Sequence, residues 1–385
     1  MGFEILSQVG QQRYYQQAIS NAAYFENAEQ IVADFCVDTE SVSVNCVATL
    51  KGHTSSVSAC VIIPDSSTIV SASADKSLKL WNTKTTKCIA TMCGHDNQVN
   101  SCDVTADGST VVSASSDKLL KLWDLVTTSC ITSLTGHIGI VKDCAVIPNK
   151  RAIVSVSHFN TVKLWDIHTG QCVTTFQAHK DYLNACTVTP DGETFITASK
   201  DGSLKLWNVD SGRCLATFES RGDSVLACAV TPDGSTIVST TSRGVKLWNI
   251  LTGECESTLE GHWDGVQGCA VTPDSSMVVT ASFDSTLKLW NIDSRKCITT
   301  LRGHNDDVND CAVSSDGSFL VSASDDKTVK IWKTALQWPC APICSKKDRG
   351  EIRGDLYYGE GIRIPHEFIR FHGICAFAPI GQIHN

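Results

Sequence analysis

Short runs of apolar and β-branched residues alternate with polar turns, and this pattern returns about every 42 residues between Val44 and Lys333. The runs of the first copy are separated by turn residues and cover residues 57–63, 68–73, 77–82 and 87–92. Runs of this length, rich in Val, Ile and Thr, predict β-strands. Small or apolar residues occupy both faces of each run, so we expect every sheet to lie between two neighbouring sheets.

Two sequence marks accompany the repeat. A Trp followed by Asn, Asp or Lys ends each of the seven copies, at Trp81, Trp123, Trp165, Trp207, Trp248, Trp290 and Trp332. Most copies also begin with Gly-His or a remnant of it, with the histidine at His53, His95, His137, His179, His262 and His304. A period of about 40 to 45 residues with these two marks resembles the WD-repeat β-propeller family.

The resemblance implies an all-β fold, a seven-bladed β-propeller over residues 44–333. The seventh copy lacks the outer strand that ends every other copy, and a matching segment at residues 45–50 precedes the first Gly-His. We therefore predict that this N-terminal strand completes the last blade and leaves no open sheet edge where the ring closes.

In the WD-repeat family, one His, one Ser or Thr, one Asp and one Trp of a copy form a buried hydrogen-bonded tetrad. In the first copy the hydroxyl comes from Ser71 or Ser73, which share a strand face. The set is complete in copies one, two, four, six and seven, where His, Asp and Trp are His53, Asp75, Trp81; His95, Asp117, Trp123; His179, Asp201, Trp207; His262, Asp284, Trp290; and His304, Asp326, Trp332. A catalytic Ser-His-Asp interpretation is disfavoured, because an active site is rarely present several times in one chain.

Copies three and five depart from the tetrad. Copy three keeps His137 but has Phe159 where Asp is expected. Copy five has Arg221 in place of His and is one residue shorter than the other copies. We expect these two blades to be the least rigid, or else to be altered for binding.

Fourteen of the nineteen cysteines occupy two fixed places in the repeat, and we predict that both are core positions where Cys acts as a small hydrophobe. One set is Cys60, Cys102, Cys144, Cys186, Cys228, Cys269 and Cys311, and the other is Cys46, Cys88, Cys130, Cys172, Cys214, Cys255 and Cys297. In a propeller these sets fall on the innermost and outermost strands, too far apart to form disulfides. So many unpaired thiols favour a reducing compartment, so we expect a cytoplasmic location, with the nucleus as a second location.

The charge pattern disfavours several classes of function. The net charge is −9 and no block of Lys and Arg could follow a phosphate backbone, so we expect no nucleic acid partner. The apolar runs are strand-sized and the N-terminus lacks the features of a secretory signal, so we expect no membrane association. Cys340 and Cys344 lack a second pair of ligands, and no nucleotide loop or nucleophile motif stands out. We therefore expect no metal, no cofactor and no enzymatic activity.

Variable positions next to the fixed ones are the candidates for partner binding. In WD-repeat proteins the residue before the tetrad Asp and the residues just after Gly-His lie on the narrower face around the central channel. Large or charged departures at these places are Ile140, Lys142, His158, Phe159, Tyr182, Lys200, Trp263 and Phe283. Aromatic residues beside cations are typical of a protein-binding hot spot, and drift on a solvated surface is the alternative.

Three of these residues carry a more specific expectation. Trp263 and Phe283 favour an interface, because exposed large apolar side chains reduce solubility and mark contact sites. Phe159 has a second interpretation, in which its ring fills the space left by the missing Asp.

The two flanks differ from the repeats. Apolar residues at helical spacing, such as Ile5, Val9 and Ile19, predict one or two helices in residues 1–43, serving as a cap on the ring or as a dimerisation or adaptor arm. Residues 334–385 read as an irregular tail. Its segment 375–381 looks like the first strand of a further repeat, so the tail is either a degenerate remnant or a sign that the chain is shortened.

These features favour a non-enzymatic scaffold or adaptor that presents a propeller surface to protein or peptide partners. One alternative is a substrate receptor of a ubiquitin ligase, which needs a basic pocket that Lys142, Lys200 and Arg221 could supply. Another is a sensor propeller, because the similarity among copies resembles the propellers of signalling proteins, including apoptosome-type NTPases. The oligomeric state and the identity of the partners are not encoded in these patterns.

Overall fold

The computed structural model describes residues 44–220, 222–334, 357–358 and 362–363. The chain divides into two compact units, Met1–Ala341 and Pro342–Asn385. In the second unit, β29 (Tyr357–Tyr358) pairs antiparallel with β30 (Ile362–Arg363). The helical flank expected in residues 1–43, the cysteines at positions 340 and 344 and the strand-like segment 375–381 lie outside the described residues.

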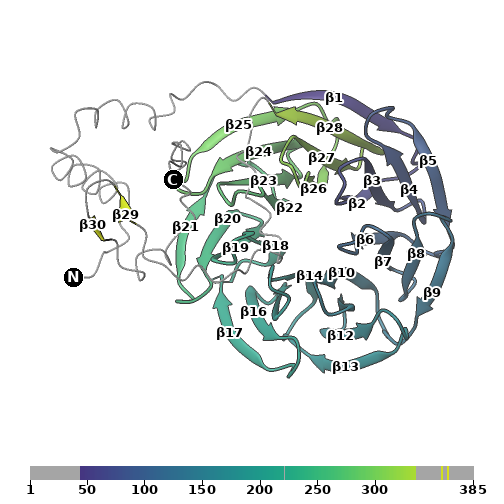
Figure 1. Ribbon diagram of the computed structural model, residues 1–385, viewed down its shortest axis with the longest axis horizontal. Helices are drawn as coiled ribbons and strands as arrows, with labels where there is room; N and C mark the ends of the chain where they lie inside the picture. The colour runs from purple at the N-terminus through teal and green to yellow at the C-terminus, as the bar shows by residue number, and fades with distance from the viewer. Residues whose placement is uncertain (1–43, 221, 335–356, 359–361, 364–385) are drawn as a thin grey trace, which may run out of the picture. The chain divides into compact units, whose positions relative to one another are not determined.

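Residues 44–334 form seven four-stranded antiparallel sheets, which are the blades of a β-propeller (Figure 1). The innermost strands are β2 (Val57–Ile62), β6 (Val99–Val104), β10 (Val141–Ile147), β14 (Leu183–Val188), β18 (Val225–Val230), β22 (Val266–Val271) and β26 (Val308–Val313). The second strands are β3 (Thr68–Ser73), β7 (Thr110–Ser115), β11 (Ala152–Ser157), β15 (Thr194–Ser199), β19 (Thr236–Thr241), β23 (Met277–Ser282) and β27 (Phe319–Ser324).

The other two strands of each blade carry the tetrad Trp and the outer edge. The third strands are β4 (Ser77–Asn82), β8 (Leu120–Asp124), β12 (Thr161–Asp166), β16 (Ser203–Asn208), β20 (Gly244–Asn249), β24 (Thr286–Asn291) and β28 (Thr328–Thr334). The outermost strands are β5 (Cys88–Cys93), β9 (Cys130–Leu134), β13 (Cys172–Gln177), β17 (Cys214–Glu219), β21 (Cys255–Leu259), β25 (Cys297–Arg302) and β1 (Val44–Lys51). The predicted all-β seven-bladed fold is confirmed, and the strands of the first copy match within one residue.

The ring closes as predicted. The N-terminal strand β1 pairs antiparallel with β28 and forms the outer edge of blade seven, whose sheet has the order β1-β28-β27-β26. Lys330 donates a hydrogen bond from Nζ to Thr49 Oγ1 at 2.9 Å across this pair. Leu50 of β1 is 1% exposed and packs with Val57 and Trp81 of blade one. The first strand of the chain therefore seals the contact between the last blade and the first.

The hydrophobic core lies between blades. In each of the seven blades, five successive residues of the second strand are buried. The tetrad Trp residues are between 1% and 6% exposed. Trp123 of blade two packs with Leu80 and Met92 of blade one, and the other blade pairs repeat this arrangement. Removing a buried Trp side chain costs about 3–5 kcal/mol in protein cores, so each interface depends strongly on one residue.

Carboxylates also connect neighbouring blades. Asp143 of blade three accepts a hydrogen bond from the backbone N–H of Cys186 in blade four at 2.8 Å. Asp310 of blade seven accepts one from the N–H of Cys60 in blade one at 3.0 Å. Burial raises the pKa of Asp310 to about 7, while the two backbone N–H groups that it accepts work against this rise. These carboxylates act in the assembly of the ring, where each holds the inner strand of the next blade.

One prediction about the cysteines was wrong. The inner set is buried, apart from Cys269, which is half-buried, but all seven cysteines of the outer set are exposed. The outermost strand of each blade has a face that no further strand or blade covers, so its first residues meet solvent. Cys88 Sγ, for example, donates to the carbonyl of Ala90 at 3.3 Å. Each blade does lie between two neighbouring blades, as expected, but much of every outer strand stays exposed.

The described residues hold neither a membrane-spanning helix nor a metal cluster. No helix in the part of the chain that the structure describes is long and apolar enough to cross a membrane. Among the same residues, no group of three or more His, Cys, Asp and Glu side chains is placed to hold a metal ion.

Candidate functional site

The tetrad of blade one joins the loop before β2, the strand β3, the turn after β3 and the strand β4 through hydrogen bonds. His53 Nδ1 lies 2.8 Å from Asp75 Oδ2, and His53 Nε2 lies 2.7 Å from Ser71 Oγ. Trp81 Nε1 donates to the same Ser71 Oγ at 2.8 Å. The structure thus selects Ser71, whereas Ser73 Oγ donates to the carbonyl of Ser56 at 2.8 Å.

Charge in the tetrad is fixed by its surroundings. Burial lowers the pKa of His53, although its hydrogen bond to Asp75 works in the opposite direction. Burial would raise the pKa of Asp75, but hydrogen bonds from Ser77, the Thr54 N–H and His53 hold it at about 2. The neutral His53 and the charged Asp75 therefore belong to a hydrogen-bonded network in which each polar side chain has a partner. It leaves Ser71, which is 0% exposed, unreachable for a substrate.

The same bonds recur in four further blades. Pairs of His Nδ1 and Asp oxygen lie at 2.7 Å in blade two, 3.1 Å in blade four, 2.7 Å in blade six and 2.8 Å in blade seven. The hydroxyl groups that receive the Trp Nε1–H bonds in these blades are those of Ser113, Thr197, Thr280 and Ser322. The five tetrads assigned from the sequence are therefore all present.

Blade three keeps only part of this network. His137 Nε2 contacts Ser155 Oγ at 2.7 Å, but its Nδ1 reaches only Thr161 Oγ1 at 3.3 Å. Burial without a carboxylate partner lowers the pKa of His137 to about 3. Ser157 Oγ and Asn160 Oδ1 of this blade are buried without a hydrogen-bond partner among the described residues. Blade three is thus the least satisfied blade that retains a tetrad His.

Blade five has Ser242 where the tetrad Asp is expected, and its position 221 lies outside the described residues. Lys246 Nζ donates to the carbonyl and hydroxyl oxygens of Ser220 at 2.8 and 2.9 Å. Asp223 lies 3.7 Å from Lys246 Nζ and 3.3 Å from Arg243 Nε. The Trp bond survives, because Trp248 Nε1 still donates to Ser239 Oγ at 2.8 Å.

Backbone hydrogen bonds bring the variable positions together on one face, which we call the upper face. It comprises the loops that carry the tetrad His and the turns that carry the tetrad Asp. In most blades the residue before the tetrad Asp donates its N–H to the carbonyl three residues after the His. In blade three His158 bonds to Ile140 at 3.1 Å, and in blade four Lys200 bonds to Tyr182 at 2.8 Å. The two variable positions of these blades are therefore neighbours.

The next variable position lies where the inner strand has an irregular register. In blade two Asn100 occupies this bulge and donates to the carbonyl of Val141 in blade three at 2.7 Å. Blade three has Lys142 in the same place, and its side chain is exposed. Nearby protein atoms remove water from this ammonium and lower its pKa, while Asp143 works in the opposite direction.

Four of the predicted residues form one cluster across blades three and four. The rings of His158 and Tyr182 are stacked, with centroids 5.1 Å apart and an interplanar angle of 21°. Lys200 Nζ lies 5.6 Å from the centre of the Tyr182 ring, within the range of a cation–π contact. Burial and the charge of Lys142 lower the pKa of His158. We call Lys142, His158, Tyr182 and Lys200 the aromatic–cation cluster.

The remaining predicted residues lie apart from this cluster. Ile140 is half-buried, and its backbone carbonyl accepts the hydrogen bond from the N–H of His158. Phe159 is 55% exposed and its ring lies so close to Gly139 that an added Cβ would be 2.2 Å from Cδ2. Phe159 therefore packs over the loop at Gly139. The residue that contacts His137 in place of the missing Asp is Thr161. Trp263 is 77% exposed.

Phe283 was expected to be exposed and is instead half-buried. Its ring approaches Gly265, and Leu226 of blade five reaches the same glycine, where a Cβ would meet Phe283 Cδ2 at 3.6 Å and Leu226 Cδ1 at 3.9 Å. The side chains of Phe283 from blade six and Leu226 from blade five thus both lie near Gly265. The sequence missed Leu226, because only its packing against the next blade distinguishes it.

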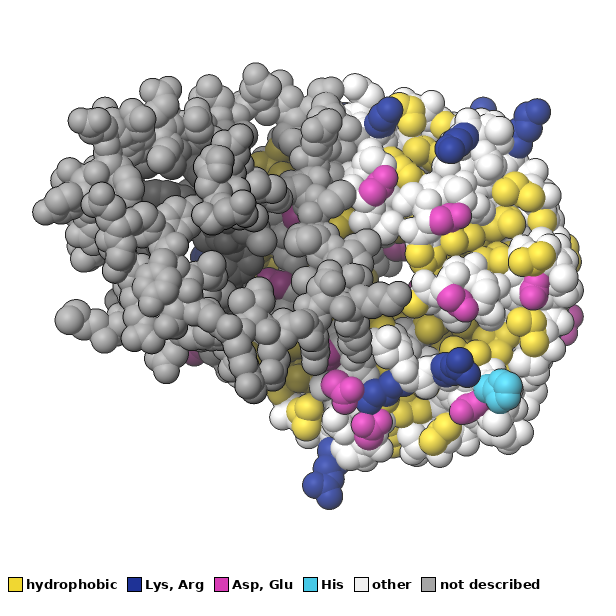
Figure 2. Space-filling view, in the orientation of Figure 1, with side chains coloured by type: hydrophobic (Ala, Val, Ile, Leu, Met, Phe, Trp, Pro, Cys, Tyr) yellow, Lys and Arg dark blue, Asp and Glu magenta, His cyan; other side chains and the backbone are white. Residues whose placement is uncertain are grey.

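Sequence reasoning also missed a group of carboxylates on the upper face. Burial and the nearby charges of Asp306, Asp325 and Asp264 raise the pKa of Asp307. The sequence contained a signal for this group, because Asp307 and Asp325 occupy the same two variable positions of the repeat in blade seven as Tyr182 and Lys200 do in blade four. The upper face therefore has lysines at blades three and four and carboxylates at blades six and seven. In the view of Figure 2, hydrophobic side chains lie between charged ones on the visible surface.

The strand order, the closing strand and the tetrads define a seven-bladed β-propeller of repeated units. The model of the family described as WD domain, G-beta repeat matches residues 44–82, 86–124, 128–166, 170–208, 212–249, 253–291 and 295–333. These segments cover more than half of the chain, so the protein belongs to the WD-repeat family. A comparison with curated proteins gives no match. Propellers of this family typically serve as scaffolds for protein interactions and are generally not enzymes.

Proposed function

We propose that this protein is a non-enzymatic adaptor that binds protein partners through the upper face of blades three and four. The observation that carries the proposal is Tyr182, which is 46% exposed, stacks on the ring of His158 and makes a cation–π contact with the ammonium of Lys200. An aromatic ring fixed in this way offers contact area at little entropic cost, which is typical of binding hot spots. Most variable positions of blades one and two carry small or polar side chains instead.

The charges favour a partner segment with both signs. Lys142 and Lys200 suit an acidic side chain, while Asp264, Asp307 and Asp325 on the other side suit a basic one. Such complementarity selects orientation and speeds association more than it adds affinity. The free inner thiols, buried in the core, are compatible with a reducing compartment such as the cytosol or nucleus.

A substrate receptor of a ubiquitin ligase is a narrower version of the same role. Lys142 and Lys200 of the aromatic–cation cluster supply the basic surface that an acidic recognition motif would need. Co-purification of ligase subunits with the wild-type chain would favour this version over a general adaptor or a sensor propeller.

The test is affinity purification with quantitative mass spectrometry. The wild-type chain is compared with a Tyr182→Ala, Lys200→Ala double variant, which removes exposed side chains and leaves the backbone bond between these residues in place. The matched control is Gln98→Ala, at the position of Tyr182 in blade two. We expect partners to be lost by about tenfold or more from the double variant only, as for a hot spot worth about 2 kcal/mol. An unchanged partner list for a double variant that melts like wild type would reject this surface.

A further inference from the structure

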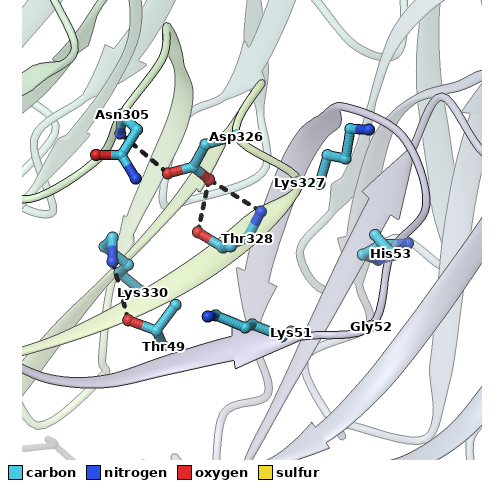
Figure 3. Close-up of a pocket in the computed structure, with 9 residues that line it drawn as sticks. All are labelled: Thr49, Lys51, Gly52, His53, Asn305, Asp326, Lys327, Thr328 and Lys330. Atoms are coloured by element: carbon cyan, nitrogen blue, oxygen red, sulfur yellow. Dashed lines mark hydrogen bonds between the residues drawn. The ribbon is translucent and has the colours of Figure 1, made fainter.

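A hollow of about 410 Å³ lies where the ring closes, outside the aromatic–cation cluster. Its walls come from the end of β1, the start of β28 and the turn before β28 (Figure 3). Three lysines line it, Lys51 from β1, Lys327 from the turn and Lys330 from β28. We call this site the seam hollow. Its size is in the range of pockets that hold small ligands or single side chains.

The lysines of the seam hollow differ in what already binds them. Lys330 Nζ is held by Thr49 Oγ1 at 2.9 Å. The side chains of Lys51 and Lys327 are exposed and make no hydrogen bond or ion pair with any residue that the structure describes. Two ammonium groups, one from each of the segments that close the ring, are therefore available to a ligand.

The one carboxylate in the wall is already occupied. Asp326 accepts hydrogen bonds from His304 at 2.8 Å and from the N–H and hydroxyl of Thr328 at 3.0 and 2.6 Å. Burial would raise the pKa of Asp326, but these bonds hold it well below its usual value. Figure 3 shows the carboxylate pointing to Thr328 and Asn305 rather than to Lys51. Three ammonium groups and one carboxylate leave the hollow with an excess of two positive charges.

The other blades provide an internal comparison, because the third strand carries a Lys in every blade. The position of Lys51, at the end of the outer strand, reads Cys93, Thr135, Gln177, Glu219, Glu260 and Arg302 in blades one to six. The position of Lys327, just after the tetrad Asp, is Lys76 in blade one, Lys118 in blade two and Asn160 in blade three. Within the described propeller only blade seven combines all three lysines, so the repeat itself does not explain them.

We propose that the seam hollow binds the phosphate of a phosphorylated serine or threonine on a protein partner. A phosphate monoester carries close to two negative charges and three acceptor oxygens, which match the excess charge and the free donors of Lys51 and Lys327. A carboxylate would balance only half of that charge. The proposal rests on the proposed role as a protein-binding scaffold, but it uses residues that the aromatic–cation cluster does not.

The variants can be taken from the protein's own repeats. Lys51→Gln together with Lys327→Asn gives the seam hollow the residues of blade three, Gln177 and Asn160. Asn tolerates the left-handed backbone here, since φ is 67° at Lys327 and 58° at Asn160. The matched control is Lys76→Asn, which removes one lysine from the equivalent turn of blade one, where φ is 71°. All three substitutions are therefore expected to preserve the fold.

The probes are a pool of short peptides with one phosphoserine among random residues, the same pool without phosphate, and inorganic phosphate. Binding is measured by fluorescence anisotropy for the peptides and by calorimetry for the ion. We expect the phosphorylated pool to bind wild type. The double variant should bind this pool about 100-fold more weakly, because each of the two removed charge-assisted hydrogen bonds is worth about tenfold in affinity. The control variant should bind like wild type.

Several outcomes would overturn the proposal. These are equal binding of the two peptide pools, or an equal loss of affinity in the control and the double variant. Inorganic phosphate binding as tightly as the phosphorylated pool would mean that the site takes a small phosphate rather than a protein. The Tyr182→Ala, Lys200→Ala variant separates the two ideas. This variant should lose its protein partners but keep phosphopeptide binding. That result would show that the aromatic–cation cluster and the seam hollow bind independently.

Discussion

Blade seven and blade three depart from the regular repeat in opposite ways. Blade seven is assembled from both ends of the propeller, yet its tetrad is complete and β1 occupies the place of an ordinary outer strand. Blade three is continuous in sequence, yet its His137 lacks a carboxylate partner and Ser157 Oγ is buried without a hydrogen bond among the described residues.

The difference shows that the propeller tolerates a change of chain connectivity better than the loss of a buried hydrogen-bond partner. A change of connectivity keeps the strand pairing, because β1 pairs with β28 as β5 pairs with β4. A change of residue removes hydrogen bonds that no other residue fully replaces. A buried polar group without a partner costs about 1–3 kcal/mol, so the departure in blade three lowers the stability of that blade. Both departures coincide with surfaces that we propose for binding.

The strongest test of this comparison is removal of residues 44–50. Blade seven would lose most of its outer strand, the buried Leu50 and the hydrogen bond from Lys330, so we expect a loss of more than about 5 kcal/mol in unfolding free energy. Denaturant unfolding followed by circular dichroism measures this loss. The control is Val47→Ser, at a position 56% exposed on the same strand, which should change stability by less than about 0.5 kcal/mol. A deletion that unfolds like wild type would contradict closure by β1.

A smaller effect should separate the two tetrads. His304→Ala in blade seven removes bonds to Asp326 and Ser322 and leaves a carboxylate without its partner, so we expect a loss of about 2–4 kcal/mol. His137→Ala in blade three removes one short bond, to Ser155, and should cost about 1–2 kcal/mol. Urea midpoints at an unchanged slope report both values. Equal losses would mean that the tetrad carboxylate contributes nothing to blade stability.

The smallest effect should come from repair of blade three. Phe159→Asp returns a carboxylate to the position where Asp75 of blade one contacts its His, and Thr161 occupies the place of Ser77, which donates to Asp75. We expect a gain of about 1 kcal/mol at pH 7, measured by urea unfolding. Phe159→Ser, which removes the ring without adding a charge, is the matched control. A gain of the same size in the control would assign the effect to loss of the exposed ring.

The pH dependence of stability provides a second test of the Phe159→Asp variant. The pKa of His137 is lowered from 6.5 to about 3 in the folded protein, so between these values the unfolded chain binds more protons. The contribution of this group to stability is therefore complete above pH 6.5 and is lost as the pH falls toward 3. A carboxylate at position 159 raises the folded pKa and reduces that loss. The advantage of Phe159→Asp over wild type should thus be larger at pH 5 than at pH 7.

Much of the fold follows from local pattern. The strand boundaries, the closing strand and five tetrads were predicted, because turn residues, strand period and repeat length are all encoded within about 42 residues of chain. The choice between Ser71 and Ser73 was not predictable. Both point to the same side of β3, and only the depth of the Trp81 indole in the assembled blade selects Ser71. The exposure of the outer cysteines was missed because every blade repeats the position, which looked like a core signal.

The sequence by itself therefore determined the repeat, the number of blades, the order of strands and the residues that hold each blade together. Tertiary structure decided which residues of different blades meet. His158 stacks on Tyr182, and Lys51 faces the same hollow as Lys327, only because the ring brings neighbouring blades and the two ends of the propeller side by side. Periodicity fixes contacts within a unit, whereas burial and charge between units depend on how the units pack.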